Sequence, residues 1–346
     1  MSAINFGLGL LDLYSGANFK QIDTRHSEDN RKPYEGKKIP LSVTFSCTHR
    51  CNLVCIHCQA ENSDTADEIP SKRFVELIDE IADAGCQKIG FTGGEPLIRK
   101  DIGEALERCY ARGMVTTLVT NGFPVFKYID QLEKLSLLFI SLDGNQEVND
   151  RIRGEKSFEK FLEAVKLAKS RHIPVCALTT LTSMNYDVVD EMCKIVEDLG
   201  IHWMIGVIQT RFTGFAEQDF KQGQLEKMLE RVSKVKNLRT SKTYMDFVLG
   251  KRAMSKCFAG IGYAIIAPTG KIFPCFPAQF DHASYSGISV LDRNFGEAFQ
   301  ELPLYRATCD TCALACHIET NYLYLFNPDN IRQSFRLTKP ITNTHS

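Results

Sequence analysis

The sequence predicts an α/β fold with a parallel sheet, followed by a small cysteine-rich C-terminal domain. Three observations predict it: six strand-like segments alternate with amphipathic helices, several helices end at a glycine, and the alternation stops after about residue 250. Alternating strands and helices form parallel βαβ units, which either close into a barrel or remain an open doubly wound sheet. The pattern alone leaves both arrangements open.

The expected strands are short runs rich in apolar and β-branched residues. They cover residues 41–45, 88–91, 116–119, 137–142, 174–180 and 203–208. Between them, apolar residues recur at helical spacing, first at Phe74, Leu77, Ile78 and Ile81. The same spacing predicts further helices near residues 102–109, 158–165, 189–199 and 225–232.

The composition excludes several classes of protein. The chain has 346 residues, 44% of them hydrophobic, and its net charge of −1 gives no reason to expect nucleic-acid binding. It shows no secretory signal and no apolar run of the roughly 18 residues that a membrane span needs. The thirteen cysteines are clustered, which in a cytoplasmic protein favours metal binding over disulfides. We therefore expect a cytoplasmic metal-binding protein without a transmembrane segment.

The same patterns divide the chain into regions. Residues 1–40 form an N-terminal extension whose apolar residues, among them Leu13 and Tyr14, could pack on the main domain, contact a membrane surface or contact a partner. The other regions are a βα core over 41–212, a helical connector over 213–250, a cysteine-rich domain over 251–320 and a C-terminal tail over 321–346.

The loop after the first strand carries a C-x3-C-x2-C pattern formed by Cys51, Cys55 and Cys58. Three neighbouring thiols always leave one out of a disulfide framework, and zinc usually takes ligand pairs from two separated segments. Iron–sulfur clusters are held by thiolates, normally four, so three ligands leave one iron open for chemistry. Cys47 and Cys51 are also separated by three residues, like the first two cysteines of the pattern. Only the pattern that begins at Cys51 ends in C-x2-C. We expect Cys47 to be a core residue at the strand end.

Polar or glycine-rich residues also follow the next four expected strands. In parallel α/β folds the carboxyl ends of the strands form the ligand-binding edge. The residues at these ends are Gly93, Gly94, Glu95, Asn121, Ser141, Asp143, Thr180 and Asn185. We expect them to surround one ligand site beside the cysteine loop.

A second group of cysteines lies near the C-terminus. Residues 263–274 predict a hairpin with its turn at Thr269 and Gly270, which would bring Cys257 and Cys275 together. Three more cysteines follow, at Cys309, Cys312 and Cys316. Four thiolates suffice for one metal site, and the spacing leaves both iron–sulfur and zinc open.

The first cysteine pattern, with Asn52-Leu53 after its first cysteine and His57 before its last, resembles that of the radical S-adenosylmethionine (radical SAM) superfamily. The resemblance covers about residues 41–210 and implies a partial (β/α)6 parallel barrel. It also implies a SAM-coordinating 4Fe–4S cluster, S-adenosylmethionine as cofactor, and a reductant such as flavodoxin or ferredoxin. The cluster ligands would be Cys51, Cys55 and Cys58. Such enzymes reductively cleave SAM to a 5′-deoxyadenosyl radical, which abstracts hydrogen from the substrate.

The resemblance extends to the residues that contact SAM. Gly93-Gly94-Glu95 resembles the family's GGE motif, which binds the methionyl amino group. Ser141 and Asp143 stand where the family contacts the ribose, and Arg153 is a candidate for the methionyl carboxylate. The set of cofactor-binding residues that we expect is Gly93, Gly94, Glu95, Asn121, Ser141, Asp143, Arg153 and Thr180. No catalytic side chain is implied.

The spacing of Cys257, Gly270 and Cys275, followed by C-x2-C, is similar to the auxiliary-cluster extension called the SPASM domain, or its shorter twitch version. The chain departs from the full pattern, because no cysteine follows Cys316 and five cysteines cannot ligate two clusters. We expect one auxiliary iron–sulfur cluster, with Cys257, Cys275, Cys309 and Cys312 as favoured ligands and Cys316 replacing one of them or free. His317 and Glu319 are candidates for hydrogen bonds to these ligands.

The leading hypothesis is a radical SAM oxidoreductase or maturase acting on a peptide or small molecule, with the auxiliary cluster transferring electrons or binding substrate. The N-terminal extension is short for a complete leader-binding domain, which weakens the hypothesis that the substrate is a peptide. One alternative is a radical SAM enzyme of lipid or cofactor biosynthesis. An alternative of another class is a non-catalytic zinc-binding protein.

Overall fold

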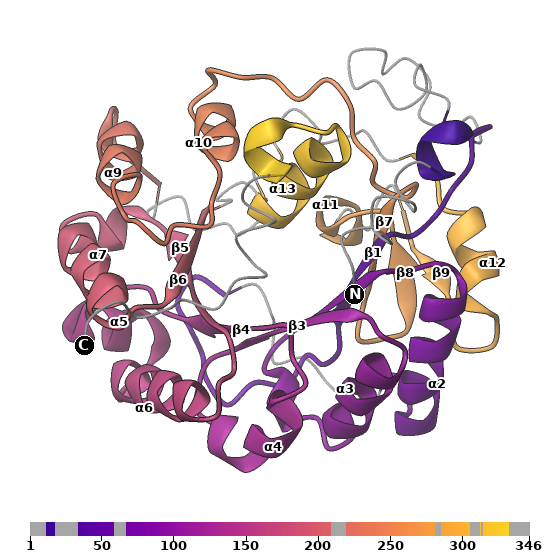
Figure 1. The fold of residues 1–346 in the computed structure, drawn as a ribbon, viewed down its shortest axis with the longest axis horizontal. Helices are drawn as coiled ribbons and strands as arrows, with labels where there is room; N and C mark the ends of the chain where they lie inside the picture. Colours follow the sequence, from indigo (N-terminus) through magenta and orange to yellow (C-terminus); the bar gives the residue numbers. More distant parts are fainter. Residues whose placement is uncertain are drawn as a thin grey trace.

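The computed structural model describes residues 12–17, 34–58, 67–208, 219–280, 285–304, 312 and 314–331. Within these residues, the six expected strands form a curved parallel run in the order β6-β5-β4-β3-β2-β1 (Figure 1). Their bounds are β1 Ser42–Ser46, β2 Lys88–Thr92, β3 Val115–Thr120, β4 Leu137–Ser141, β5 Val175–Leu181 and β6 His202–Val207. The α/β fold and its partial parallel barrel are confirmed.

Helices cover the convex side of this sheet (Figure 1). Aromatic packing joins the layers, because the ring of Phe74 on α2 lies 4.9 Å from that of Phe45 on β1 and 6.2 Å from that of Phe91 on β2. The helices of this half are α2 Ser71–Asp83, α3 Ile102–Ala111, α4 Ile129–Leu132, α5 Gln146–Arg153, α6 Ser157–Ser170, α7 Val189–Asp198, α9 Gln224–Val232 and α10 Lys242–Val248, with 3-10 turns η2 Pro96–Ile98, η3 Val125–Tyr128 and η4 Ser183–Asn185.

Residues on the concave side of the sheet remain partly accessible to solvent. On β2, Ile89 and Phe91 are buried against the helices, whereas the alternate residues are accessible. Strand register carries this alternation to the neighbouring strands, since Thr44 and Thr117 both pair with Gly90. We call the accessible inward residues the lumen face: Ser42, Thr44, Lys88, Gly90, Thr92, Val115, Thr117, Val119, Phe139, Leu178, Thr180, His202, Met204 and Gly206.

The C-terminal hairpin continues the same sheet. β7 (Tyr263–Ile266) pairs in parallel with β1, and β8 (Lys271–Phe273) and β9 (Ile288–Ser289) follow it in antiparallel order. The predicted turn is confirmed, with Gly270 at a φ of 71°. The sequence did not predict that this hairpin adds to β1, because the partner strand lies more than 200 residues away. The hydrogen-bonded sheet therefore runs across the expected domain boundary near residue 250, which stays a prediction.

Helix α13 (Ala315–Tyr324) lies beside both β6 and β1. The Cβ of Ala315 is 3.7 Å from where a Cβ on Gly206 of β6 would stand, and Tyr324 Oη lies 2.9 Å from Ser42 Oγ of β1. Figure 1 shows it on the open side of the curved sheet, between α10 and β7. The remaining helices of the C-terminal part are α11 Phe276–Phe280 and α12 Phe295–Gln300.

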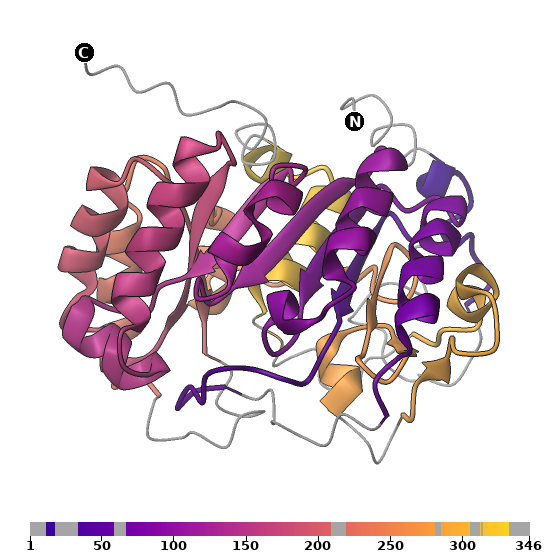
Figure 2. The ribbon, with the colours of Figure 1, turned by 90° about the horizontal axis from the view of Figure 1, so that it is seen from below.

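The described part of the N-terminal extension packs on this C-terminal part (Figure 2), the first of its three expected roles. Leu13 is fully buried, and the ring of Tyr14 lies 5.9 Å from that of Phe258. Leu13 belongs to the same buried apolar cluster as Cys257 and Cys275. In the described ranges, no helix has both the length and the apolar character needed to cross a bilayer.

Candidate metal and cofactor site

The three cysteines of the first pattern lie on one loop at the carboxyl end of β1. Cys58 N donates to Cys55 O over 3.1 Å, which turns the loop back on itself. Burial raises the pKa of the Cys55 thiol to about 11, Arg153 opposes this shift, and the charges of Cys58 and Cys51 add to it. The charges of the three thiols therefore affect one another. This donor set fits a cluster held by three thiolates.

A buried arginine ties together the two ends of this loop. Arg99 Nη1 donates to Cys47 O over 3.0 Å, and Nη2 donates to Ile69 O over 2.8 Å. Asp101 balances its charge, with 2.8 Å between Arg99 Nε and Asp101 Oδ1. Cys47 is fully buried, and its Sγ donates to Thr92 O over 3.2 Å, which confirms it as a core residue at the strand end.

Gly93 and Gly94 are the points at which the loop after β2 touches the cysteine loop. A Cβ on Gly94 would stand 2.1 Å from Arg50 O, and one on Gly93 would stand 2.5 Å from Thr48 O. Main-chain hydrogen bonds join the loops here, from Gly94 N to Thr48 O and from Glu95 N to Arg50 O, each 2.8 Å long. Both glycines are therefore needed for packing between the loops, a role that the sequence did not show.

The Glu95 carboxylate is fully buried and held by protein donors. Its Oε1 accepts from Leu97 N over 3.1 Å and from Thr120 Oγ1 over 2.9 Å. Its Oε2 accepts from Asn121 N over 2.7 Å. Burial raises the pKa of Glu95 to about 7, although these donors oppose the shift. The side chain thus joins the ends of β2 and β3.

Asn121 connects the end of β3 to the cysteine loop. Its Nδ2 donates to Asn52 Oδ1 over 2.7 Å and reaches Cys51 Sγ at 3.8 Å. Its Oδ1 accepts from Phe123 N over 3.1 Å, which sets the orientation of the amide. The amide therefore presents a donor to one of the expected cluster ligands.

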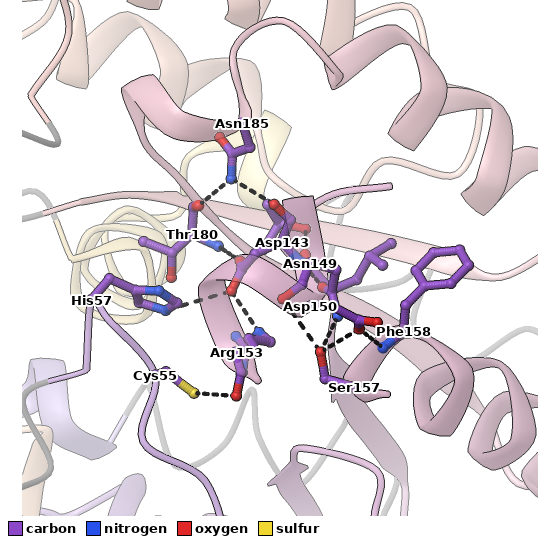
Figure 3. A network of polar contacts seen from close by, with 12 residues as sticks. Cys55, His57, Asp143, Asn149, Asp150, Arg153, Ser157, Phe158, Thr180 and Asn185 are labelled. Atoms are coloured by element: carbon purple, nitrogen blue, oxygen red, sulfur yellow. Dashed lines mark hydrogen bonds and ion pairs between the residues drawn. The ribbon is translucent and has the colours of Figure 1, made fainter. Parts of the chain in front are cut away.

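Figure 3 shows a polar network around Asp143, a fully buried residue at the end of β4. Asp143 Oδ2 lies 2.6 Å from Arg153 Nε and 3.4 Å from His57 Nε2. Its Oδ1 accepts from Thr180 N over 2.8 Å. Cys55 Sγ lies 3.8 Å from Arg153 O. Asp143 therefore links the cysteine loop to the ends of β4 and β5.

Two more of the expected edge residues are buried beside this network. Asn185 Nδ2 donates to Thr180 O over 2.9 Å and to Asp143 O over 3.1 Å, so its amide braces the loop after β5. Ser141 is 7% exposed and pairs with Leu178 in the sheet.

Helix α5 supplies Arg153 and was absent from the prediction. Asn145 Oδ1 accepts from Val148 N over 3.1 Å and caps the helix, and Val148 and Ile152 are buried. Ile56 N donates to Ile152 O over 3.0 Å, so the end of α5 also holds the cysteine loop. The signal was an asparagine cap followed by two apolar residues four apart, which is too short for periodicity to detect.

In the second cysteine group, Cys257 Sγ lies 3.6 Å from the hydroxyl of Tyr263. Burial raises the pKa of Tyr263, and the charges of Cys257, Cys275 and Cys312 raise it further. Cys257 and Cys275 are buried. Cys309 lies outside the described residues. Three of the four favoured auxiliary ligands, Cys257, Cys275 and Cys312, are thus among the described residues, and thiols are the donors that an iron–sulfur cluster takes.

The other candidates near the C-terminus have separate neighbours. Cys316 is exposed. Burial lowers the pKa of Lys88 on the lumen face, and Cys316 opposes that shift. His317 Nε2 accepts from Phe276 N over 3.4 Å, next to Cys275. Among the described residues, no three His, Cys, Asp or Glu side chains are grouped to hold a single metal ion.

Residues 45–199 match the family model described as the radical SAM superfamily. The antilisterial bacteriocin subtilosin biosynthesis protein AlbA of Bacillus subtilis (strain 168) is 30% identical over 273 residues, covering 72% of this chain and 59% of AlbA. PqqA peptide cyclase of Xanthomonas euvesicatoria pv. vesicatoria (strain 85-10) is 28% identical over 286 residues, covering 75% of this chain and 76% of the cyclase.

Fe-coproporphyrin III synthase of Methanosarcina barkeri (strain Fusaro / DSM 804) is 30% identical over 203 residues, covering 55% of this chain and 51% of the synthase. The chain thus spans less than two thirds of this synthase and of AlbA. The crystal structure of Streptococcus suis SuiB bound to precursor peptide SuiA superposes with a TM-score of 0.66 at 16% identity. It covers 85% of this chain and 74% of SuiB, a likeness of fold.

Proposed function

The chain carries a radical SAM domain over residues 45–199, and from this premise we propose that it reductively cleaves S-adenosylmethionine and modifies a peptide. The 5′-deoxyadenosyl radical would abstract hydrogen from the substrate, and an auxiliary iron–sulfur cluster would transfer electrons or bind substrate. The observation that carries this proposal is the docking of the three-cysteine loop on the loops that follow β2, β3 and β4.

Cys51, Cys55 and Cys58 would hold the SAM-binding 4Fe–4S cluster. When bound, that cluster supplies an open iron for SAM and the electron that breaks its sulfonium C–S bond. The protein's own contribution is to orient and shield. Arg99 fixes the ends of the loop, and the Asn121 amide directs a hydrogen toward Cys51 Sγ.

SAM would lie across the loops after β2 and β4. The Glu95 carboxylate is already bonded to three protein donors, so we assign the methionyl amino group to main-chain oxygens of Gly93 and Gly94. Asp143, braced by Arg153 and by Thr180 N, would order the ribose and carboxylate side together with Ser141. These roles follow from the position of each residue at the carboxyl edge of the sheet.

The thiols around Tyr263 support one auxiliary cluster in a SPASM/twitch-like arrangement. Cys257, Cys275 and Cys312 would be three of its ligands, and Cys309 or Cys316 would be the fourth. Flavodoxin or ferredoxin in the cytoplasm is the reductant that we propose, because the reaction consumes single electrons.

A peptide is the substrate class that we favour. PqqA peptide cyclase and the subtilosin biosynthesis protein AlbA are similar over more than 70% of this chain, and SuiB shares the fold and binds the peptide SuiA. A tetrapyrrole of cofactor biosynthesis is the second candidate, favoured by the 30% identity to Fe-coproporphyrin III synthase.

The test is anaerobic reconstitution with iron and sulfide, followed by dithionite and SAM. We expect about eight irons per chain if both clusters are of the four-iron type, and 5′-deoxyadenosine detected by mass spectrometry. Replacing Cys51, Cys55 and Cys58 together by alanine should remove about four irons and abolish 5′-deoxyadenosine formation. A similar triple change at the buried core thiols Cys86, Cys109 and Cys176 should leave the iron content unchanged.

A colourless protein that binds zinc and leaves SAM intact would contradict the proposal and favour the zinc-binding alternative. Neighbouring genes separate the substrate classes, since a short precursor-peptide frame supports a peptide and a tetrapyrrole pathway supports the second candidate.

A further inference from the structure

Within the second cysteine group, a buried hydrogen-bond chain leads to one sulfur. Asn321 on α13 is fully buried, and its Oδ1 accepts from Phe258 N over 2.7 Å, which sets the orientation of its amide. Its Nδ2 donates to His317 O over 2.8 Å and to Tyr263 Oη over 3.0 Å, and lies 3.7 Å from Cys257 Sγ. One amide hydrogen thus goes to His317 O and the other goes to Tyr263 Oη, beside Cys257 Sγ.

The direction of the next bond follows from this arrangement. Tyr263 Oη accepts a hydrogen from Asn321, so its own proton remains to be donated. Cys257 Sγ lies 3.6 Å from that hydroxyl. A thiolate that binds iron has no proton to give, so the contact runs from the hydroxyl to the sulfur. Donation therefore proceeds from Asn321 to Tyr263 and from Tyr263 to Cys257.

We propose that Tyr263 and Asn321 are positioning residues that raise the reduction potential of the auxiliary cluster by hydrogen-bonding its Cys257 ligand. This inference rests on the auxiliary cluster of the proposed function. Hydrogen bonds to the sulfurs of a cluster withdraw negative charge and favour the reduced state. The bonds lie among buried residues, with Tyr263 4% and Cys257 6% exposed, where little water competes for the sulfur.

The test changes one hydroxyl and measures a potential. Tyr263→Phe removes the donor and keeps the ring. It is introduced into the full-length chain in which Cys51, Cys55 and Cys58 are all replaced by alanine, so that only the auxiliary cluster contributes a signal. A redox titration followed by electron paramagnetic resonance should give a more negative potential than in the parent triple variant.

Tyr324→Phe is the matched control. Tyr324 is 1% exposed in the same apolar cluster, but its Oη donates to Gly262 O over 3.2 Å. Its removal should leave the potential where it was. A second measurement uses the parent protein itself: the iron–sulfur stretching bands in resonance Raman spectra should shift after reconstitution in heavy water, and Tyr263→Phe should reduce that shift.

The outcomes separate this inference from the proposed function. An unchanged potential in Tyr263→Phe, or an equal shift in Tyr324→Phe, overturns the inference while the auxiliary cluster stands. A triple variant that binds no iron overturns the auxiliary cluster and the inference together. If Tyr263→Phe fails to bind iron, the heavy-water measurement on the parent decides, and unshifted bands overturn the inference.

Discussion

Glu319 is a half-buried residue whose carboxyl group ties α13 to α10. Its Oε1 accepts from Ser241 N over 2.7 Å at the start of α10, and Asn330 Nδ2 donates to its Oε2. Burial raises the pKa of Glu319 to about 7, and the bonds to Ser241 oppose the shift. The sequence suggested a contact with the auxiliary ligands, but the structure gives this residue a role at a helix start.

A raised carboxyl pKa predicts a pH-dependent stability. The folded protein binds more protons than the unfolded chain between the ordinary glutamate pKa of about 4.5 and about 7, so this contribution is full below that window and is lost as the pH rises through it. The loss is roughly 1 kcal/mol per pH unit. Glu319→Gln should remove this pH dependence. The unfolding free energy of the variant, measured by urea unfolding, should therefore rise relative to that of wild type from pH 5.5 to 7. A constant difference between the two proteins over this range would contradict the prediction.

Single residues show which part of the site the sequence could predict. The positions of Glu95, Asn121 and Asp143 follow from the strand pattern, because parallel strands bring their carboxyl ends to one edge. Their partners do not follow, since the donors to Glu95 belong to two separate segments, Leu97 after β2 and Thr120 with Asn121 at the end of β3. Arg99 was missed for the same reason. It donates to the main-chain oxygens of Cys47 and Ile69, which become neighbours only after folding.

At the scale of the elements, the two loops that meet at Gly94 form one unit. Gly94→Ala would place a Cβ 2.1 Å from Arg50 O, a main-chain atom that cannot move alone. We expect a loss of about 1–3 kcal/mol in unfolding free energy and a lower iron content at Cys51, Cys55 and Cys58.

Gly103→Ala in helix α3 is the control for this change. Its Cβ would lie 3.2 Å from Gln131 Cγ, an atom of a flexible side chain, and alanine favours helix. Unfolding followed by circular dichroism and iron analysis check both variants. Equal iron loading in Gly94→Ala and Gly103→Ala would show that contact between the loops does not hold the cysteines.

Periodicity predicted the strands to within one residue and the long amphipathic helices, because each buries one face. It missed α5, which has eight residues, and α13. Helix α13 buries polar His317 and Asn321 along with Ile318, so its sequence carries no single apolar stripe. A helix that contacts protein on several sides has no apolar face opposite a polar face, and periodicity detects only that difference between faces.

At the scale of the molecule, β1 is an interior strand with β2 on one side and β7 on the other. A chain that ends at residue 250 lacks β7 and Ile261, so it would leave the edge of β1 unpaired and would expose Leu41, which packs in the same apolar cluster as Ile261. We expect this fragment to aggregate or to lose cooperative thermal unfolding, as measured by light scattering and circular dichroism. A monomeric fragment with a sharp transition would show that residues 41–212 fold as an independent unit.

The place of β1 in the sheet also affects how the protein is made in the cell. Translation produces the cysteine loop and its supports up to Asn185 well before β7, because chains are made from the N-terminus. Until Tyr263–Ile266 has left the ribosome, β1 has an open edge directly beside unloaded thiols. Iron delivery to Cys51, Cys55 and Cys58 on the nascent chain would therefore act on an unfinished sheet. Insertion once β7 has paired with β1 would meet a complete scaffold, so we expect the proposed cluster at these cysteines to be acquired only after that pairing.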